Sequence, residues 1–276
     1  MPQLSPRRVA PSSRTGFDAS QIPFAALGDT CCAAIRSLEV LVETTNNFAR
    51  HVRIVEGVVE NMPMLQDATR SERSEVAAHA RLRTLQRGAI ACRCGEPMPG
   101  ILVVAFGLLK LALPRPESEE RVLRFVGANE TFGEAPALLD RPAPFDAAAL
   151  SDSMLVVIPR APVLRLLEHH PVVAQKLIAH LAEDYLSLLS ELQALAQRNG
   201  VQRLASYLVS LAGPQRAANG CQVRLPASKT TVAARLGVQK ETLSRMLRGL
   251  SERGCIRVEG RVITILDRTR LSGLAA

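Results

Sequence analysis

Residues 228–260 read SKTTVAARLGVQKETLSRMLRGLSERGCIRVEG, and the apolar spacing in this stretch decides the fold of the last third of the chain. Two short amphipathic segments flank Gly237, whose lack of a side chain suits the strained backbone of a tight turn. The small residue Ala233 stands where two crossing helices would approach each other, and Ser228 is a good N-cap. The pattern predicts a helix-turn-helix over residues 229–248.

The second helix of this motif carries two distinct faces. Its core face has apolar residues at i, i+3, i+4 and i+7, namely Leu243, Met246, Leu247 and Leu250. The opposite face, which we call the outer stripe, lies roughly 200° around the axis. It consists of Glu241, Ser244, Arg245 and Arg248. Glu241 and Arg245 could form an i, i+4 ion pair, but on an exposed helix such a pair contributes only about 0.2–0.5 kcal/mol.

The residue types of the outer stripe suit the major groove of DNA. Arg245 can donate two hydrogen bonds to guanine, Glu241 can accept one from the amino group of cytosine, and Ser244 can do either. A carboxylate near phosphates opposes binding unless a base donor meets it, so Glu241 is expected to add selectivity rather than affinity. Contacts to the DNA backbone are expected from surrounding polar and basic residues. These are Lys229, Thr230, Gln239, Lys240, Arg248, Arg257 and Arg261.

The net charge of +8 is concentrated in the last third of the chain. From Arg198 to the end there are 14 Lys and Arg against 4 Asp and Glu, whereas residues 1–197 hold 20 against 22. A compact basic module on a nearly neutral body suits nucleic-acid binding. On charge alone, a basic surface without a partner fits equally well.

The chain divides into four segments that differ in composition and in the spacing of their apolar residues. Residues 1–60 form an N-terminal extension, partly disordered, because its first part is rich in Pro, Ser and Arg. Residues 64–170 contain short apolar runs separated by glycines, which predicts a small β-barrel or sandwich. Residues 171–198 are predicted to be one long helix, although Pro162 is an alternative start. Residues 199–272 give a helix, a strand, the helix-turn-helix and a hairpin that turns at Glu259 and Gly260, so the class is α+β.

The long helix repeats large apolar residues at alternating steps of 3 and 4, the spacing of a coiled-coil seam. The seam comprises Ile178, Leu181, Tyr185, Leu188, Leu192 and Leu195. A second apolar set, Leu177, Leu186 and Leu189, is predicted to cover the barrel. Two apolar faces favour a homodimer, while burial of both faces within a monomer remains the alternative.

Other function classes receive little support from the sequence. No apolar run approaches the roughly 20 residues that span a bilayer, and the N-terminus lacks the apolar core of a signal peptide. A cytoplasmic location without a membrane partner is therefore expected. Gly-rich phosphate loops, GxSxG and HExxH are missing, so no enzyme is expected. The remaining rival is a ligand-binding regulatory module that acts through a protein partner, and the outer stripe argues for DNA instead.

Four stretches carry a resemblance to a known family. They are CGEPMPGILVVAFGLLKLAL (94–113), FVGANETFGEAPALL (125–139), VVIPRAPVLRLLEHHP (156–171) and the opening stretch. Over residues 64–272 the chain resembles the Crp/Fnr superfamily, named after the cyclic-AMP receptor protein and the fumarate-nitrate reduction regulator, and within it the Fnr-like denitrification regulators.

This resemblance implies an architecture and a set of partners. The expected order is a cyclic-nucleotide-binding-like jelly roll (β-roll) that acts as sensor, a dimerisation helix and a winged helix-turn-helix. The implied partners are a second copy of the chain, RNA polymerase and double-stranded DNA. Because Glu241, Ser244 and Arg245 match the motif of the Fnr branch, the implied DNA site is an inverted repeat resembling TTGAT and ATCAA half-sites.

The resemblance also implies an effector pocket at Gly133 and Glu134, with Arg141 as a poorly spaced candidate for a phosphate ligand. Cyclic-nucleotide binders carry Arg and then Ser or Thr where this chain has Phe145 and Asp146. A ring and a carboxylate oppose a phosphate, so we predict no response to cyclic AMP. A redox, oxygen or nitric oxide signal is expected instead, and a cyclic-nucleotide-responsive regulator is the alternative.

The cofactor stays unknown at this stage. The chain has six cysteines, and their spacing matches no usual iron–sulfur pattern. Cys31 and Cys32 lie in the extension, and Cys92 and Cys94 are predicted to share one face of a strand. A redox or metal site at these cysteines therefore stays open beside the interpretation as structural thiols. His180, on the long helix, is a candidate haem ligand.

Overall fold

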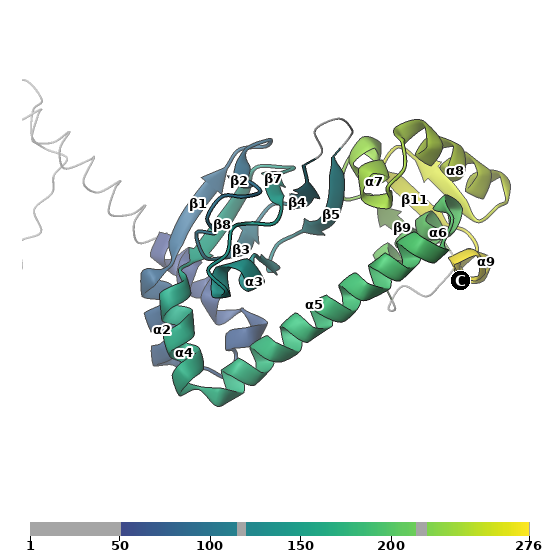
Figure 1. Ribbon diagram of the computed structural model, residues 1–276. Coiled ribbons are helices and arrows are strands. Elements are labelled where there is room, and N and C mark those ends of the chain that lie inside the picture. Colours follow the sequence, from purple (N-terminus) through teal and green to yellow (C-terminus); the bar gives the residue numbers. More distant parts are fainter. Residues whose placement is uncertain (1–50, 115–119, 214–219, 276) are drawn as a thin grey trace, which may run out of the picture. The chain divides into compact units, whose positions relative to one another are not determined.

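The structure is a computed structural model that describes residues 51–114, 120–213 and 220–275 (Figure 1). The predicted disorder at the start of the chain and the pair Cys31 and Cys32 lie outside the described residues. Within the described part, none of the helices combines the length and the apolar character that crossing a membrane requires.

Short helices precede the strands. Residues 51–60 are helical, so the end of the predicted extension is ordered, and η2 (Pro63–Leu65) and α2 (Arg70–His79) follow. A capping box starts α2, in which the backbone N–H of Thr69 donates to Glu72 at 2.7 Å. Hydrogen bonds from the Thr69 hydroxyl and then its backbone lower the pKa of Glu72. The buried faces of these helices join the apolar cluster that β3, β8 and α5 also supply.

The middle of the chain is a roll of two antiparallel four-stranded sheets, as the glycine-separated runs predict. One sheet has the order β1 (Arg81–Leu85), β8 (Ser153–Ile158), β3 (Ile101–Phe106) and β6 (Thr131–Phe132). The other has the order β2 (Ile90–Cys92), β7 (Asp146–Ala149), β4 (Leu109–Leu113) and β5 (Arg121–Val126). The short helix α3 (Glu134–Leu138) follows β6. Leu102, Leu109, Phe132 and Leu155 are among the fully buried side chains of the core.

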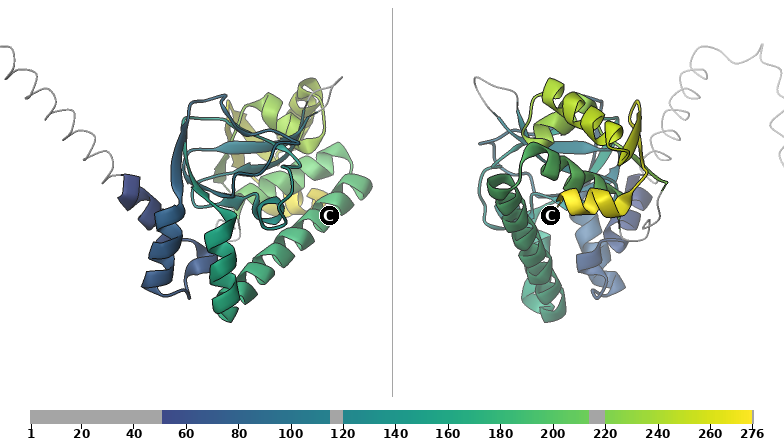
Figure 2. Two further views of the ribbon diagram at one scale, coloured as in Figure 1. Left: turned by 60° about the vertical axis from the view of Figure 1, so that its left-hand side comes forward. Right: turned by 90° about the vertical axis from the view of Figure 1, so that its right-hand side faces the viewer.

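Two helices, not one, follow the roll. Pro162 lies inside α4 (Arg160–His169), and Pro171 begins α5 (Pro171–Gln197). Between them His170 leaves the helical region, with φ −130° and ψ 84°, because a residue that precedes proline disfavours helical angles. From Pro171 onward α5 is a single unbroken helix of 27 residues (Figure 2). Of the second apolar set only Leu177 is buried; Leu186 and Leu189 are exposed, so the prediction that all three cover the roll was wrong.

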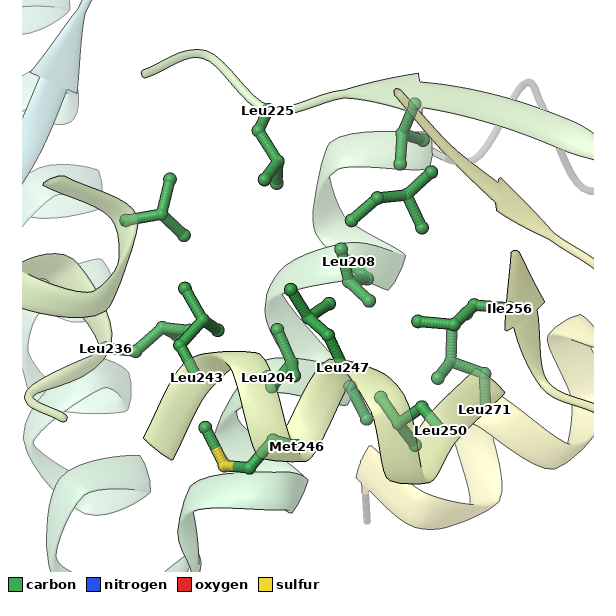
Figure 3. Close-up of a cluster of buried hydrophobic side chains, with 14 of the residues drawn as sticks. Leu204, Leu208, Leu225, Leu236, Leu243, Met246, Leu247, Leu250, Ile256 and Leu271 are labelled. Atoms are coloured by element: carbon green, nitrogen blue, oxygen red, sulfur yellow. The ribbon is translucent and has the colours of Figure 1, made fainter. Parts of the chain in front are cut away.

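The last third forms the predicted winged helix-turn-helix. Its elements are α6 (Gly200–Ala212), β9 (Cys221–Arg224), α7 (Lys229–Leu236), α8 (Lys240–Glu252), β10 (Ile256–Glu259), β11 (Val262–Ile265) and α9 (Arg268–Ala275). Leucines from α6, α7, α8 and α9 point toward one another and toward Ile256 of β10 (Figure 3). Glu259 pairs with Val262, so the wing turns at Gly260 and Arg261, one residue later than predicted.

Candidate nucleic-acid interface and sensor cavity

The crossing of α7 and α8 follows the local sequence. Ser228 caps α7, with its hydroxyl accepting from the Thr231 N–H at 3.2 Å. Ala233 is fully buried at the crossing. Gly237 ends α7 with φ +67°, a left-handed conformation that glycine adopts without strain, and the Val238 N–H bonds to the Ala233 carbonyl at 3.0 Å. These contacts fix the angle at which α8 leaves the turn.

The two faces of α8 are arranged as predicted. The four core-face residues are buried, and all four residues of the outer stripe are exposed. The Ser244 hydroxyl bonds to the Lys240 carbonyl at 3.0 Å, and Arg245 donates to the Thr242 hydroxyl at 3.3 Å. Among the ion pairs of the described residues, none involves Glu241 or Arg245. The charges of the outer stripe therefore face solvent without an internal counter-ion.

The residues that were predicted to contact the DNA backbone lie at the starts of α7 and α8, on α8 itself and on the wing. Lys229 and Thr230 begin α7, while Gln239 caps and Lys240 begins α8. Both helix N-termini present free N–H groups and a partial positive charge, which attract phosphate. Arg257 is exposed on β10.

Arg261, which was predicted to contact the DNA backbone, also makes hydrogen bonds within its own domain. Its guanidinium donates to the carbonyls of Leu225 and Pro226 at 2.8 and 2.7 Å and so ties the wing to the segment before α7. Arg203 of α6 likewise donates to the carbonyls of Leu236 and Arg198 at 3.2 and 2.6 Å. No local sequence pattern marks Arg203 as a structural residue, because its partner Leu236 lies 33 positions away.

On the sensor side, the structure brings Glu134 and His180 together. Gly133, with φ +83°, starts α3, and Glu134 is only 5% exposed. Among the described residues its Oε1 has no hydrogen-bond partner, and it lies 3.7 Å from His180 Nε2. Arg141, the third predicted pocket residue, is exposed on the surface after α3. The buried carboxylate thus faces α5, and the poorly spaced arginine does not bury with it.

A cavity of about 750 Å³, which we call the sensor cavity, is lined by His180 of this pair but not by Glu134. It lies among η2, α5 and the segment from β5 to β6. Its polar lining includes Arg124, Thr131, Lys176, His180 and Asp184. Asp184 Oδ2 lies 3.6 Å from Arg124 Nη1 and 4.0 Å from His180 Nε2. A network of charged side chains therefore connects the roll with α5.

Apolar side chains fill the part of the roll next to Gly133. Phe145 packs against Phe132 with ring centroids 6.4 Å apart. A Cβ added at Gly133 would lie 2.2 Å from the Met98 methyl group, so Met98 packs directly onto this glycine. These contacts support the expectation that the position of Phe145 does not hold a phosphate.

Within the described ranges, no group of three or more His, Cys, Asp or Glu is arranged to hold a metal ion. The predicted shared strand face of Cys92 and Cys94 was wrong, because Cys92 ends β2 while Cys94 lies in the turn after it. There the Cys94 N–H donates to Asp146 at 2.7 Å. His180 faces two carboxylates in a charged cavity, which is a poor environment for the apolar ring of haem.

The two cysteines beside β2 are expected to differ in reactivity. Burial raises the pKa of the Cys92 thiol to about 11, whereas the Cys94 side chain is exposed. Because the thiolate is the reactive form, a maleimide at neutral pH should label Cys94 in the folded protein and Cys92 only after unfolding. Peptide mass spectrometry after timed labelling measures this. Equal labelling rates for both thiols in the folded protein would contradict the burial of Cys92.

Two domain families match parts of this chain. Residues 82–170 match the cyclic nucleotide-binding domain family, and residues 202–274 match the Crp-like helix-turn-helix domain family. The transcriptional activator protein anr of Pseudomonas aeruginosa is 27% identical over 195 residues, which cover 70% of this chain and 80% of that protein.

Two solved structures are also similar. A transcriptional regulator of the CRP/FNR family from Thermus thermophilus has a TM-score of 0.55 and 29% identity, covering 71% of this chain and 98% of that one. FixK2 from Bradyrhizobium japonicum shares the fold, with a TM-score of 0.63, 22% identity and the same two coverages, 71% and 98%.

Proposed function

We propose that this chain, which belongs to the Crp/Fnr family of transcription regulators, is a homodimer that binds an inverted repeat of TTGAT-like half-sites. The family is not enzymatic. The observation that carries the proposal is the outer stripe, exposed and without internal counter-ions near the N-terminus of the second helix of a helix-turn-helix. That part of the motif reaches base edges in the major groove.

Within this proposal the residues divide into two roles. Glu241, Ser244 and Arg245 contact base edges, where paired hydrogen bonds distinguish one base from another. The DNA backbone is contacted by residues at the helix starts, on the last turns of α8 and on the wing, which fix the register on the duplex. These are Lys229, Thr230, Gln239, Lys240, Arg248, Arg257 and Arg261. Since Arg261 already bonds to two carbonyls, its share is expected to be the smallest.

The remaining partners follow from α5 and from the family. The seam residues of α5 are proposed to pair with a second copy of the chain, since most of them are exposed on this one. We further propose that the dimer acts in the cytoplasm and contacts RNA polymerase, as expected for a transcription regulator of this family.

We propose that a signal sensed on the roll side controls DNA affinity, and that the sensor cavity with Glu134 and His180 receives it. A buried carboxylate oxygen without a hydrogen bond is unfavourable. A ligand that bonds to Glu134, or a change in the distance between Glu134 and His180, should therefore alter the stability of this conformation strongly. The resemblance to the Fnr branch supports a redox, oxygen or nitric oxide signal. A cyclic nucleotide is the alternative, because residues 82–170 match that domain family, but Met98 occupies the space beside Gly133 and Phe145 packs on the preceding residue, Phe132.

A direct binding measurement tests the proposed function. Fluorescence anisotropy at one fixed salt concentration should give about 10³-fold or more tighter binding to a TTGAT–ATCAA inverted repeat than to a scrambled duplex of equal length. Series of duplexes with different spacers between the half-sites find the preferred geometry. Equal affinity for all duplexes would instead favour the rival function, a regulatory module that acts through a protein partner.

A further inference from the structure

One face of α7 is covered by the roll, while the outer stripe of α8 remains exposed. Ala234 of α7, 8% exposed, packs with Ala112 of β4 and Val122 of β5 in one apolar cluster. Figure 1 shows α7 beside β5. Phe125, also on β5, packs against both this cluster and the core of the helix-turn-helix domain. The first helix of the motif is therefore held by side chains that belong to the sensor roll.

A charged contact holds the neighbouring residue of α7 on the long helix. Arg235 donates from Nη2 to Glu191 Oε1 of α5 at 2.5 Å, and both side chains are partly buried. From its place in a basic helix-turn-helix, Arg235 could be assigned to a DNA phosphate. Its guanidinium instead bonds to a carboxylate of the same chain.

The turn of the motif is also in contact with β5. A Cβ added at Gly237 would lie 1.6 Å from Nη1 of Arg121, so this guanidinium lies directly against the turn. Gly237 is thus required twice, once for its left-handed backbone and once for the space that Arg121 occupies. Together, the contacts of Ala234, Arg235 and Gly237 with β4, β5 and α5 form what we call the docking contact.

Two of the elements that make the docking contact, β5 and α5, also line the sensor cavity. On β5, Arg121 and Val122 face α7, while Arg124 lines the cavity. On α5, Glu191 holds Arg235, while His180 and Asp184 line the cavity about two to three turns earlier. A shift of either element at the cavity therefore acts on α7 through a packed strand or a continuous helix.

We propose that Ala234, Arg235 and Glu191 are positioning residues for DNA recognition, which hold the helix-turn-helix with its outer stripe exposed and link it to the sensor cavity. This inference rests on the proposed function. We take the conformation that contains the docking contact to be the one that binds DNA. In it the docked face of α7 is buried, while Glu241, Ser244 and Arg245 stay exposed. Loss of the contact should therefore weaken specific binding.

Two variants that both make the chain more positive distinguish this proposal from a general electrostatic attraction to DNA. Glu191→Gln removes one negative charge, and the control Gln193→Lys adds one positive charge at an exposed position on the same helix. Attraction to DNA phosphates alone predicts slightly tighter binding for both variants. The docking contact predicts that Glu191→Gln binds the inverted repeat between about 3-fold and 30-fold more weakly, while Gln193→Lys does not.

A charge swap in the full-length chain completes the test. Arg235→Glu and Glu191→Arg should each weaken specific binding, and the double variant should restore most of it, because the pair re-forms with reversed charges. Thermal unfolding and sedimentation verify that each variant is folded and has the oligomeric state of the wild type. If Glu191→Gln binds as tightly as the wild type, or the double variant is no better than Arg235→Glu, the docking contact has no positioning role. Failure of the proposed function is distinguishable, since the wild type itself would then not prefer the repeat.

Discussion

Replacing Arg245 with alanine is expected to remove most of the discrimination between the TTGAT-type repeat and a scrambled duplex. Arg245 is exposed, and the hydrogen bond that it donates to the Thr242 hydroxyl at 3.3 Å is long and readily exchanged for one to a base. A bidentate arginine–guanine pair contributes about 1–3 kcal/mol of discrimination. Because a homodimer places Arg245 in two half-sites, the total loss is about 2–6 kcal/mol, and the preference for the repeat should fall by about 30-fold or more.

Arg248→Ala is the matched control for this variant. It removes the same side chain from the same outer stripe, one helical turn farther from the N-terminus of α8. If Arg248 contacts phosphate, its loss should weaken binding to both duplexes alike and reduce the slope of log affinity against log salt by about 1 per subunit. Anisotropy titrations of both variants at several salt concentrations measure both quantities. Wild-type behaviour of both variants on both duplexes would refute the assignment of the outer stripe to DNA.

The local features of the fold were readable from the sequence because near neighbours along the chain produce them. The spacing of Leu243, Met246 and Leu250 places them on one helix face whatever surrounds it, and Ser228 and Gly237 mark where α7 begins and ends. Glycines between short apolar runs indicated the strands of the roll for the same reason. The exposure of the outer stripe follows from the same helical period.

What the sequence could not supply are contacts between residues far apart in the chain. Arg235 and Glu191 are separated by 44 positions, and no periodicity relates them. His180 and Glu134 were both candidates, for haem and for the effector pocket, yet only the packing of α5 on the roll shows that they face each other. The error at Cys94 had a local cause: β2 ends at Cys92, so the strand alternation that would align the two cysteines does not continue.

The second large effect is expected from substitutions in the seam of α5. If they block dimerisation, the affinity for the inverted repeat should fall. Ile178, Tyr185, Leu188, Leu192 and Leu195 are between 41% and 67% exposed, a stripe that a monomer rarely leaves uncovered. Leu188→Glu with Leu192→Glu would place four carboxylates between two paired helices. Since both leucines are exposed in the single chain, the fold of each protomer should persist.

The expected consequence for DNA follows from bivalency. When one protomer is bound, the linked second protomer meets its half-site at a high effective concentration, which raises affinity by about 10²–10⁴-fold over a single half-site. The variant should therefore sediment as a monomer, lose a factor of this size on the inverted repeat and keep wild-type affinity for one half-site. Ser187→Glu with Gln193→Glu adds the same charge beside the seam and should change neither property, because both positions are exposed and outside the heptad pattern. A Leu188→Glu, Leu192→Glu chain that still sediments as a dimer would show that another surface joins the protomers, whereas a monomer with undiminished affinity for the repeat would show that recognition does not require two linked copies.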